Sequence, residues 1–240
     1  GGSGNVRSRR QRLGQHFLRD RGIARAIADA LRGDPPRVIE VGPGRGALTA
    51  PLLARFPKVR AIELDERLAA ALPPSLGSPA GLEVELGDAT TVDLDRLAAG
   101  GPWQLAGNLP YSVGTPIVRR VIRRGALFRY AVVMVQLEVA RRLVAPPGGG
   151  ARGLLTLEVE GCCTAAELLL AVPAGCFAPP PRVASAVVRL AIGTPGQRAR
   201  PGASERARPG GTREPAAFAE LAPVGDLVAR SRLRRLTGLH

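Results

Sequence analysis

The sequence predicts an α/β fold in which helices cover both faces of a largely parallel sheet. Two observations carry this prediction. Short apolar segments of strand length alternate along much of the chain with segments whose apolar residues recur at helical spacing. A glycine-rich turn, residues 42–46, also joins the first expected strand directly to the helix that follows it. Because alternating strands and helices pack as βαβ units, these patterns are typical of a doubly wound sheet.

The expected elements begin with a helix at residues 21–31, where Ile23, Ile27 and Leu31 lie at helical spacing before a turn at residues 33–36. The remaining strands and helices follow in alternation. We expect strands at residues 37–41, 59–64, 82–86, 103–106 and 131–136, and helices at residues 47–54, 66–71, 116–124 and 138–144. Residues 182–192 alternate in polarity, which predicts a late strand that joins the sheet in antiparallel orientation.

A change of composition near Gly193 predicts a domain boundary. Residues 193–215 are rich in Gly, Pro, Arg and Ser, which do not supply a buried core. The segment beyond them has the composition of one or two basic helices. We therefore expect a main domain at residues 5–192 and a small basic C-terminal unit at residues 193–240. The first four residues, GGSG, are interpreted as an expression remnant outside the fold.

The net charge of +14 and the sequence pI of about 11.4 predict a polyanionic partner, and nucleic acid fits best. A merely basic, soluble protein is the alternative, and the excess of Arg over Lys can also reflect a GC-rich genome. The chain has no apolar run of the length that spans a membrane and no signal-peptide pattern. Its three cysteines do not show metal-ligand spacing. We expect a cytoplasmic monomer without a metal site or membrane association.

Polar or flexible residues follow three successive predicted strands. Gly42 and Gly44 lie in the turn after the first strand, where the backbone can approach a ligand and the next helix offers free N–H groups. Glu63 ends the second strand, where a carboxylate can accept ribose hydroxyls, and Asp88 follows the third, within reach of an adenine amine. Both NAD and S-adenosylmethionine carry this adenosine. The short G-x-G-x-G spacing and the acid after the third strand favour S-adenosylmethionine, and a tight turn with surface acids is the alternative.

The tetrad Asn108-Leu109-Pro110-Tyr111 follows the fourth predicted strand and therefore lies beside the cofactor residues. Adenine N6 is a poor nucleophile because its lone pair is delocalised into the ring. The side-chain oxygen of Asn108 and the carbonyl of Leu109 can accept its two hydrogens, and Pro110 stiffens this backbone. Tyr111 offers a face on which an extruded base can stack. The tetrad predicts N6 methylation of an adenine, with an ordinary Asn-x-Pro turn as the alternative.

The chain resembles the ribosomal RNA adenine N6-methyltransferases, which include the KsgA-type dimethyladenosine transferases of the small subunit and the Erm-type macrolide-resistance enzymes of the large subunit. Seven motifs carry the resemblance: LGQHFL at residues 13–18, EVGPGRG at 40–46, ELD at 63–65, GD at 87–88, GNLPY at 107–111, VQLEVARRL at 135–143 and FAPPPRV at 177–183. The resemblance implies a Rossmann-like class I methyltransferase sheet with helices on both faces, followed by a small helical unit that helps to hold RNA.

The same resemblance implies site residues and partners. Contacts with S-adenosylmethionine are implied for His16, Leu18, Gly42, Glu63, Asp88 and Asn108. Base handling is implied for Asn108, Leu109 and Tyr111, and Phe177 stands where the family has an aromatic that closes on the flipped base. The implied reaction is transfer of methyl groups, two in this hypothesis, to N6 of a specific adenosine in ribosomal RNA or in a ribosomal subunit precursor.

Two departures from the family pattern leave the target open. His16 stands where the family has Asn, so we expect altered cofactor affinity. The C-terminal unit is short, which favours a specialised, antibiotic-resistance type of enzyme, whereas the internal motifs favour the small-subunit type. Two further alternatives are a methyltransferase of small nucleoside-like molecules and a non-catalytic relative that binds RNA or DNA.

Overall fold

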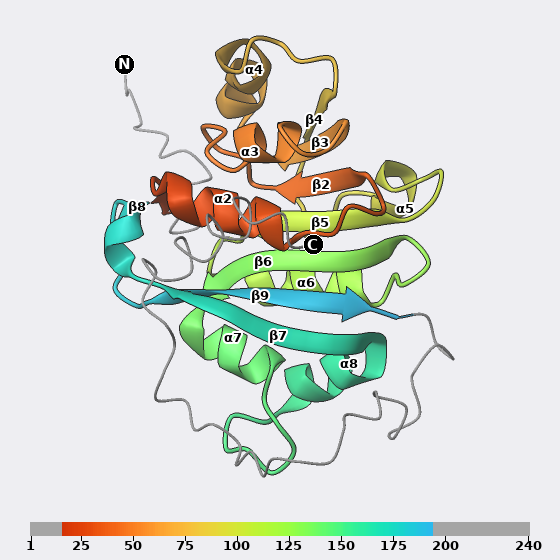
Figure 1. The fold of residues 1–240 in the computed structure, drawn as a ribbon, viewed down its shortest axis with the longest axis vertical. Helices are drawn as coiled ribbons and strands as arrows, with labels where there is room; N and C mark the ends of the chain where they lie inside the picture. The colour runs from red at the N-terminus through yellow and green to blue at the C-terminus, as the bar shows by residue number, and fades with distance from the viewer. Residues whose placement is uncertain (1–15, 194–240) are drawn as a thin grey trace, which may run out of the picture.

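The computed structural model of the protein describes residues 16–193. Its centre is a seven-stranded sheet in the order β4-β3-β2-β5-β6-β9-β7 (Figure 1). Five strands run parallel to one another: β2 (Arg37–Val41), β3 (Lys58–Glu63), β4 (Leu82–Leu86), β5 (Trp103–Asn108) and β6 (Phe128–Gln136). The predicted parallel α/β sheet is confirmed.

The last two strands complete the sheet in the opposite direction. Strand β9 (Ser185–Ile192) pairs antiparallel with β6, and β7 (Cys163–Val172) pairs antiparallel with β9. The predicted late antiparallel strand is confirmed, although it begins at Ser185 rather than at residue 182. Strand β7 was not predicted. It follows helix α8 (Leu154–Cys162) without an intervening loop, so no turn residue marks the boundary.

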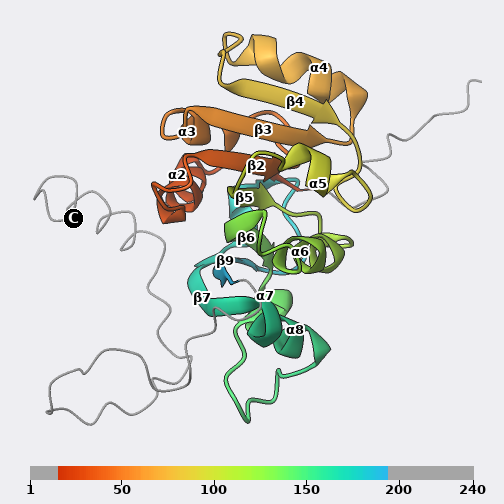
Figure 2. The same ribbon diagram turned by 90° about the vertical axis from the view of Figure 1, so that its right-hand side faces the viewer.

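Helices pack on both faces of the sheet, as Figure 2 shows from the side. Helices α2 (Arg21–Ala30) and α3 (Thr49–Leu53) cover one face. Helices α5 (Leu94–Leu97), α6 (Gly114–Ile122), α7 (Leu137–Leu143) and α8 cover the other. Helix α4 (Glu66–Ser75) packs against β3 and β4. The two faces have separate apolar cores, which meet at the sheet because its central strands are buried on both sides.

Local sequence explains where the first helix begins. The Asp20 carboxylate caps α2 by accepting the N–H of Ile23 at 3.0 Å. Ile23 and Ile27 then face the sheet and are fully buried, whereas Arg21 and Arg25 lie on the opposite, exposed side. The helix was predicted one residue longer, to Leu31, which is its C-terminal cap.

A two-stranded sheet joins distant parts of the chain. Strand β1 (Phe17–Leu18) pairs antiparallel with β8 (Phe177–Ala178), which follows a single 3-10 turn, Ala174–Cys176. Neither short strand was predicted, because each has only two residues and its partner is remote in sequence. The pairing brings the segment before α2 to the segment before β9, near the ends of β5 and β6.

Several predictions concern residues that the structure does not describe. The predicted C-terminal unit lies outside the described residues except for Gly193, as does the first part of the LGQHFL motif.

Within residues 16–193, no helix combines the length and the apolar character needed to cross a membrane. In the same range, no group of His, Cys, Asp and Glu side chains is arranged to hold a metal ion.

Candidate active site

A cavity of about 560 Å³ lies at the carboxyl ends of β2 and β5. Its walls combine the turn after β2, the turn after β5, the segment around β1 and the residues just after Phe177. The following predicted site residues line it: His16, Leu18, Gly42, Gly44, Asn108, Leu109, Pro110 and Tyr111. The structure therefore brings together in one cavity residues that the sequence places far apart, at the edge of the sheet where ligands of open α/β folds bind.

The glycine-rich turn after β2 has the conformation that its composition predicts. Gly42, Gly44 and Gly46 have φ angles of 68°, 59° and 83°, a region that other residues rarely adopt. The N–H of Gly42 donates to the carbonyl of Ile62 at 3.0 Å, and the N–H of Gly44 donates to Glu63 Oε2 at 3.1 Å. These bonds join the turn to the end of β3, so Glu63 shapes the turn.

Glu63 and Asp88 line a second, smaller cavity of about 50 Å³, which shares Gly42 and Pro110 with the first. Glu63 is fully buried, and its Oε1 accepts the N–H of Asp65 at 2.9 Å. Asp88 is exposed, and its Oδ1 accepts the N–H and the hydroxyl of Thr90 at 2.8 and 2.6 Å. The predicted cofactor residues thus occupy two adjoining cavities on either side of Gly42.

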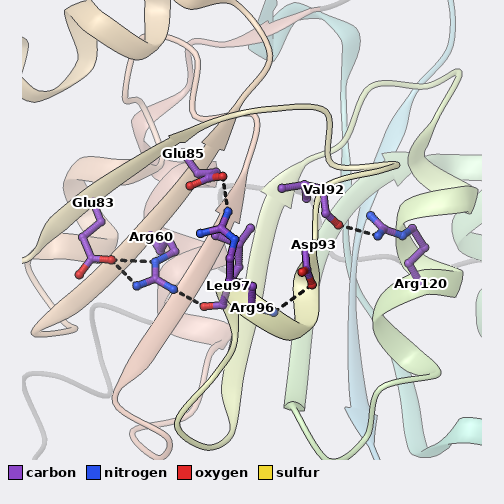
Figure 3. A network of polar contacts seen from close by, with 8 residues as sticks. All are labelled: Arg60, Glu83, Glu85, Val92, Asp93, Arg96, Leu97 and Arg120. Carbon is purple, nitrogen blue, oxygen red and sulfur yellow. Dashed lines mark hydrogen bonds and ion pairs between the residues drawn. The ribbon is translucent and has the colours of Figure 1, made fainter.

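The loop that carries Asp88 is held from the opposite side by Arg120 of α6. The guanidinium donates to the carbonyls of Ala89 and Val92, both at 2.6 Å, and Figure 3 shows the contact with Val92. Close by, Arg60 of β3 contacts both the Glu83 carboxylate and the carbonyl of Leu97 (Figure 3). Arg120 therefore joins the loop after β4 to α6, and Arg60 joins the end of α5 to β3. Sequence reasoning did not identify Arg120, because nothing in its local sequence distinguishes it from its neighbours.

The tetrad forms a fixed turn between β5 and α6. The Asn108 amide nitrogen donates to the carbonyl of His16 at 2.9 Å, which leaves its side-chain oxygen as the remaining acceptor. The N–H of Leu109 donates to the carbonyl of Met134 at 3.0 Å. The carbonyl of Pro110 accepts the N–H groups of Val113 and Gly114 at 3.1 and 2.8 Å, at the start of α6. The backbone of the turn is thus held from both sides, and the Asn108 oxygen is available to a ligand.

Tyr111 is half-buried at the wall of the same cavity. Its hydroxyl lies 2.6 Å from Ser185 Oγ, at the start of β9. Its ring centroid lies 5.4 Å from that of His16, at an interplanar angle of 40°. Burial raises the pKa of the Tyr111 phenol above its ordinary value of 10.0, so the side chain is neutral at physiological pH. An uncharged, anchored ring is suited to stacking on a base.

His16 links the tetrad to the segment after β8. Its Nδ1 lies 2.8 Å from the carbonyl of Pro179, which requires the hydrogen to be on Nδ1 in the neutral ring and leaves the Nε2 lone pair as an acceptor. Its own carbonyl accepts from Asn108. The residue that stands in place of the family's Asn is therefore part of the cavity wall.

Phe177 is placed differently from the other predicted site residues. Its side chain is 2% exposed and belongs to the apolar core beneath α2, together with Leu18 and Ile23. It does not line either cavity, whereas the next two residues, Ala178 and Pro179, line the larger one. Closure of Phe177 on a base remains a prediction, and it requires this side chain to leave the core.

Sequence reasoning missed Glu40 as a site residue. This side chain of β2 is 1% exposed, lines the larger cavity, and its Oε2 has no hydrogen-bond partner among the described residues. Burial raises the pKa of Glu40 from 4.5 to about 8, the neighbouring Thr49 hydroxyl lowers it, and the charge of Glu63 raises it further. The available signal was a single acid within the otherwise apolar end of a strand, Val38-Ile39-Glu40-Val41.

We expect Glu40 to make the free protein less stable as pH rises. The folded-state pKa lies above the unfolded value, so the folded state holds the proton more tightly. The contribution of protonated Glu40 to the free energy of unfolding is fully present below pH 4.5. It is lost as pH rises towards about 8. The difference is on the order of a few kcal/mol. Urea unfolding of the cofactor-free protein at about pH 5 and about pH 9 measures it. Glu40→Gln is the control, and an equal pH dependence in both proteins would refute the assignment.

The comparisons with known proteins agree with this geometry. A family model described as ribosomal RNA adenine dimethylase matches residues 6–199. The chain belongs to this family. The resemblance predicted from the motifs is thereby confirmed, and the residues matched include every part of both cavities.

Named members of the ribosomal RNA adenine dimethylase family show the same relation along most of the chain. The ribosomal RNA small subunit methyltransferase A of Pseudomonas fluorescens is 39% identical over 183 residues, which are 75% of this chain and 67% of the relative. The protein of the same name from Cupriavidus necator is 38% identical over 228 residues, 94% of this chain and 76% of the relative.

Solved structures of two further proteins are similar to this member of the adenine dimethylase family. The 23S rRNA methyltransferase ErmE is 32% identical, with a TM-score of 0.64 over 73% of this chain and 69% of ErmE. A dimethyladenosine transferase from Plasmodium falciparum is 32% identical, with a TM-score of 0.65 over 74% of this chain and 63% of that protein. The names of these relatives cover both ribosomal subunits, so the fold is common to both kinds of target.

Proposed function

We propose that this chain transfers two methyl groups from S-adenosylmethionine to N6 of an adenosine in small-subunit ribosomal RNA. The observation that carries the proposal is the Asn108 tetrad, whose side-chain oxygen and fixed backbone meet the glycine turn in one cavity. The membership of the chain in the adenine dimethylase family and the names of its relatives support ribosomal RNA as the substrate. These relatives act on ribosomal RNA, so we expect a cytoplasmic enzyme, and we propose residues 193–240 as its basic RNA-contacting unit.

The residues at the two cavities fit S-adenosylmethionine. Among the described residues, a buried carboxyl oxygen of Glu40 faces the larger cavity without a partner, and an ammonium group such as that of the methionine part would favour its charged form. On the other side of Gly42, Glu63 would accept ribose hydroxyls and Asp88 the adenine amine. When bound, the sulfonium supplies an activated methyl group. His16 and Leu18 would enclose the cofactor from the segment around β1.

The tetrad supplies the groups that activate the adenine. The Asn108 side-chain oxygen and the Leu109 carbonyl would accept the two N6 hydrogens, which localises the nitrogen lone pair away from the ring. These hydrogen bonds strengthen as N6 becomes cationic during methyl transfer, so they favour the transition state over the ground state. Tyr111, anchored through Ser185, would hold the extruded base by stacking. Alignment of N6 with the methyl group provides the remaining contribution.

We expect Glu63→Gln to weaken cofactor binding by about tenfold, because the neutral amide accepts ribose hydroxyls less strongly than a carboxylate does. It also turns an N–H donor towards Gly44 or Asp65, whose own N–H groups need acceptors. Isothermal titration calorimetry with S-adenosylmethionine measures the dissociation constant. Glu167→Gln, an exposed carboxylate of β7 outside both cavities, is the matched control. Equal affinities for the two variants would refute the ribose role.

The proposed reaction is tested by incubating the full chain with labelled S-adenosylmethionine and either small subunits, large subunits or their naked RNA. Nucleoside analysis is expected to find N6,N6-dimethyladenosine in small-subunit RNA. Absence of N6-methylated adenosine from all four substrates would overturn the proposal.

A second candidate function is the same chemistry on large-subunit RNA. The similarity to the 23S rRNA methyltransferase ErmE over 69% of that protein favours it. Methylation confined to the large subunit or its RNA in the same experiment would establish this candidate in place of the first.

A further inference from the structure

A second large depression adjoins the candidate active site. It has a volume of about 1110 Å³ and lies between α2 and α3. Its lining shares Arg19, Arg45 and Ala47 with the larger cavity of the active site, so the two spaces adjoin. We call it the α2–α3 groove. The proposed reaction does not account for it.

The α2–α3 groove is strongly basic. Five arginines line it: Arg19, Arg21, Arg25, Arg45 and Arg55. Asp29 is the one acid that residues 16–193 contribute to the lining, and it pairs with Arg55 at 3.2 Å. The lining therefore keeps a net excess of positive charge, which attracts a polyanion.

The positions of these arginines follow the groove from its outer end to the active site. Arg21 and Arg25 lie one helical turn apart on the exposed side of α2. Arg19 precedes this helix, and Arg45 lies in the glycine turn with its guanidinium 5.4 Å from the Phe17 ring. Both also line the larger cavity of the active site, so positive charge is present in the groove and where it adjoins that cavity.

Small side chains also line the groove. They include Ala28 of α2 and Ala50 and Ala54 at α3. Small residues leave room for a backbone to approach, and arginines on the walls can form paired hydrogen bonds with phosphate oxygens. Among the described residues, the lining has no aromatic side chain on which a base could stack. The groove is thus suited to a sugar-phosphate backbone rather than to nucleobases.

We propose that the α2–α3 groove binds the phosphates of the RNA strand next to the target adenosine. The inference rests on the proposed function, because it takes its direction from the flipped base. The groove would hold one flank of the strand by charge, without reading its sequence, while the tetrad selects adenine. Such contacts would explain how a base can be presented deep in the cavity without base pairing to position it.

The test compares the double variant Arg21→Gln/Arg25→Gln with a matched control, Arg129→Gln/Arg141→Gln. Both remove two exposed arginines from the full chain, but Arg129 on β6 and Arg141 on α7 lie outside the groove. The probe is an oligouridylate of about ten nucleotides with one central adenosine. We expect the groove variant to bind it about tenfold more weakly. We also expect the slope of log K against log salt to become about 1.4 less steep. The control is expected to differ from the unaltered chain by less than about twofold.

A second binding experiment identifies which phosphates of the RNA strand contact the groove. Neutral methylphosphonate linkages beside the adenosine, on the 5′ or the 3′ side, are expected to weaken binding to the unaltered chain on one side only. The groove variant is expected to lose no further affinity on that side. Equal losses for the two double variants, or additive losses with methylphosphonate, would overturn the proposal. If the oligonucleotide binds normally and only intact subunits bind more weakly, the groove contacts ribosomal protein and the proposal is wrong.

Two readouts separate this inference from the proposed function. Cofactor affinity is expected to be unchanged in both double variants, which also shows that they are folded. If the unaltered chain methylates RNA but the groove variant binds RNA normally, the groove inference alone fails. If RNA binds through the groove but no adenine gains a methyl group, the proposed reaction alone fails.

Discussion

Replacing Asn108 with alanine is expected to lower the rate of methyl transfer by about 10²–10³-fold at saturating cofactor, the size of effect seen when one transition-state hydrogen bond is removed. The side-chain oxygen is the acceptor that the structure leaves available once the amide nitrogen has donated to the His16 carbonyl. The alanine variant also releases that carbonyl, so cofactor affinity is expected to fall by a smaller factor. Single-turnover measurements at saturating S-adenosylmethionine separate the two effects.

Asn108→Asp is the informative companion to this variant. Aspartate keeps an acceptor oxygen but cannot donate to the His16 carbonyl, so it tests the support of the cavity wall rather than the contact with N6. We expect it to retain more single-turnover rate than the alanine variant. A rate for Asn108→Ala within about threefold of the unaltered enzyme would show that the Asn108 oxygen does not act on the adenine.

Tyr111→Ala is expected to reduce methyl transfer by about 10–100-fold, because a base that loses its stacking partner loses about 1–3 kcal/mol of binding. Cofactor affinity is expected to stay within about threefold, since the proposed role of Tyr111, anchored at Ser185, is contact with the base rather than with the cofactor. The measurements are kcat and KM for RNA, together with the cofactor dissociation constant.

Tyr111→Phe is the control for the aromatic face. It keeps the ring and removes only the hydrogen bond to Ser185, so we expect most of the activity to remain. If the phenylalanine variant is as impaired as the alanine variant, the hydroxyl rather than the ring carries the function, and stacking is not the role of Tyr111.

The parallel part of the sheet could be predicted from sequence because its strands are short, apolar and bounded by turns. β2 and β4 were predicted with their observed ends, and β5 and β6 proved longer at one end. Helix α4 extends to Ser75 through Pro73 and Pro74, beyond the predicted end at residue 71, so proline did not mark its end. Helix α8 and strand β7 were missed because they join at Cys162 and Cys163 without Gly or Pro between them.

The candidate site could be predicted where the residue type and its position after a strand indicate a particular chemical role. This holds for the glycine turn, Glu63 and the tetrad, and the structure brings them together at one edge of the sheet. Glu40 was missed because a buried acid in a strand contradicts the apolar pattern used to find the strand. The placement of Phe177 in the core depends on the long-range pairing of β1 with β8, which local patterns do not specify.

That pairing has a consequence for when the enzyme becomes active during its synthesis. His16 and the Pro179 carbonyl that holds its ring are 163 residues apart. Tyr111 likewise bonds to Ser185, which is made later than Tyr111. Chains emerge from the ribosome from the N-terminus and form long-range contacts only after both segments have been made. We therefore expect a nascent chain that ends before β8 to lack the closed cavity. An enzyme whose proposed substrate is ribosomal RNA would thus be inert towards the ribosome during most of its own translation.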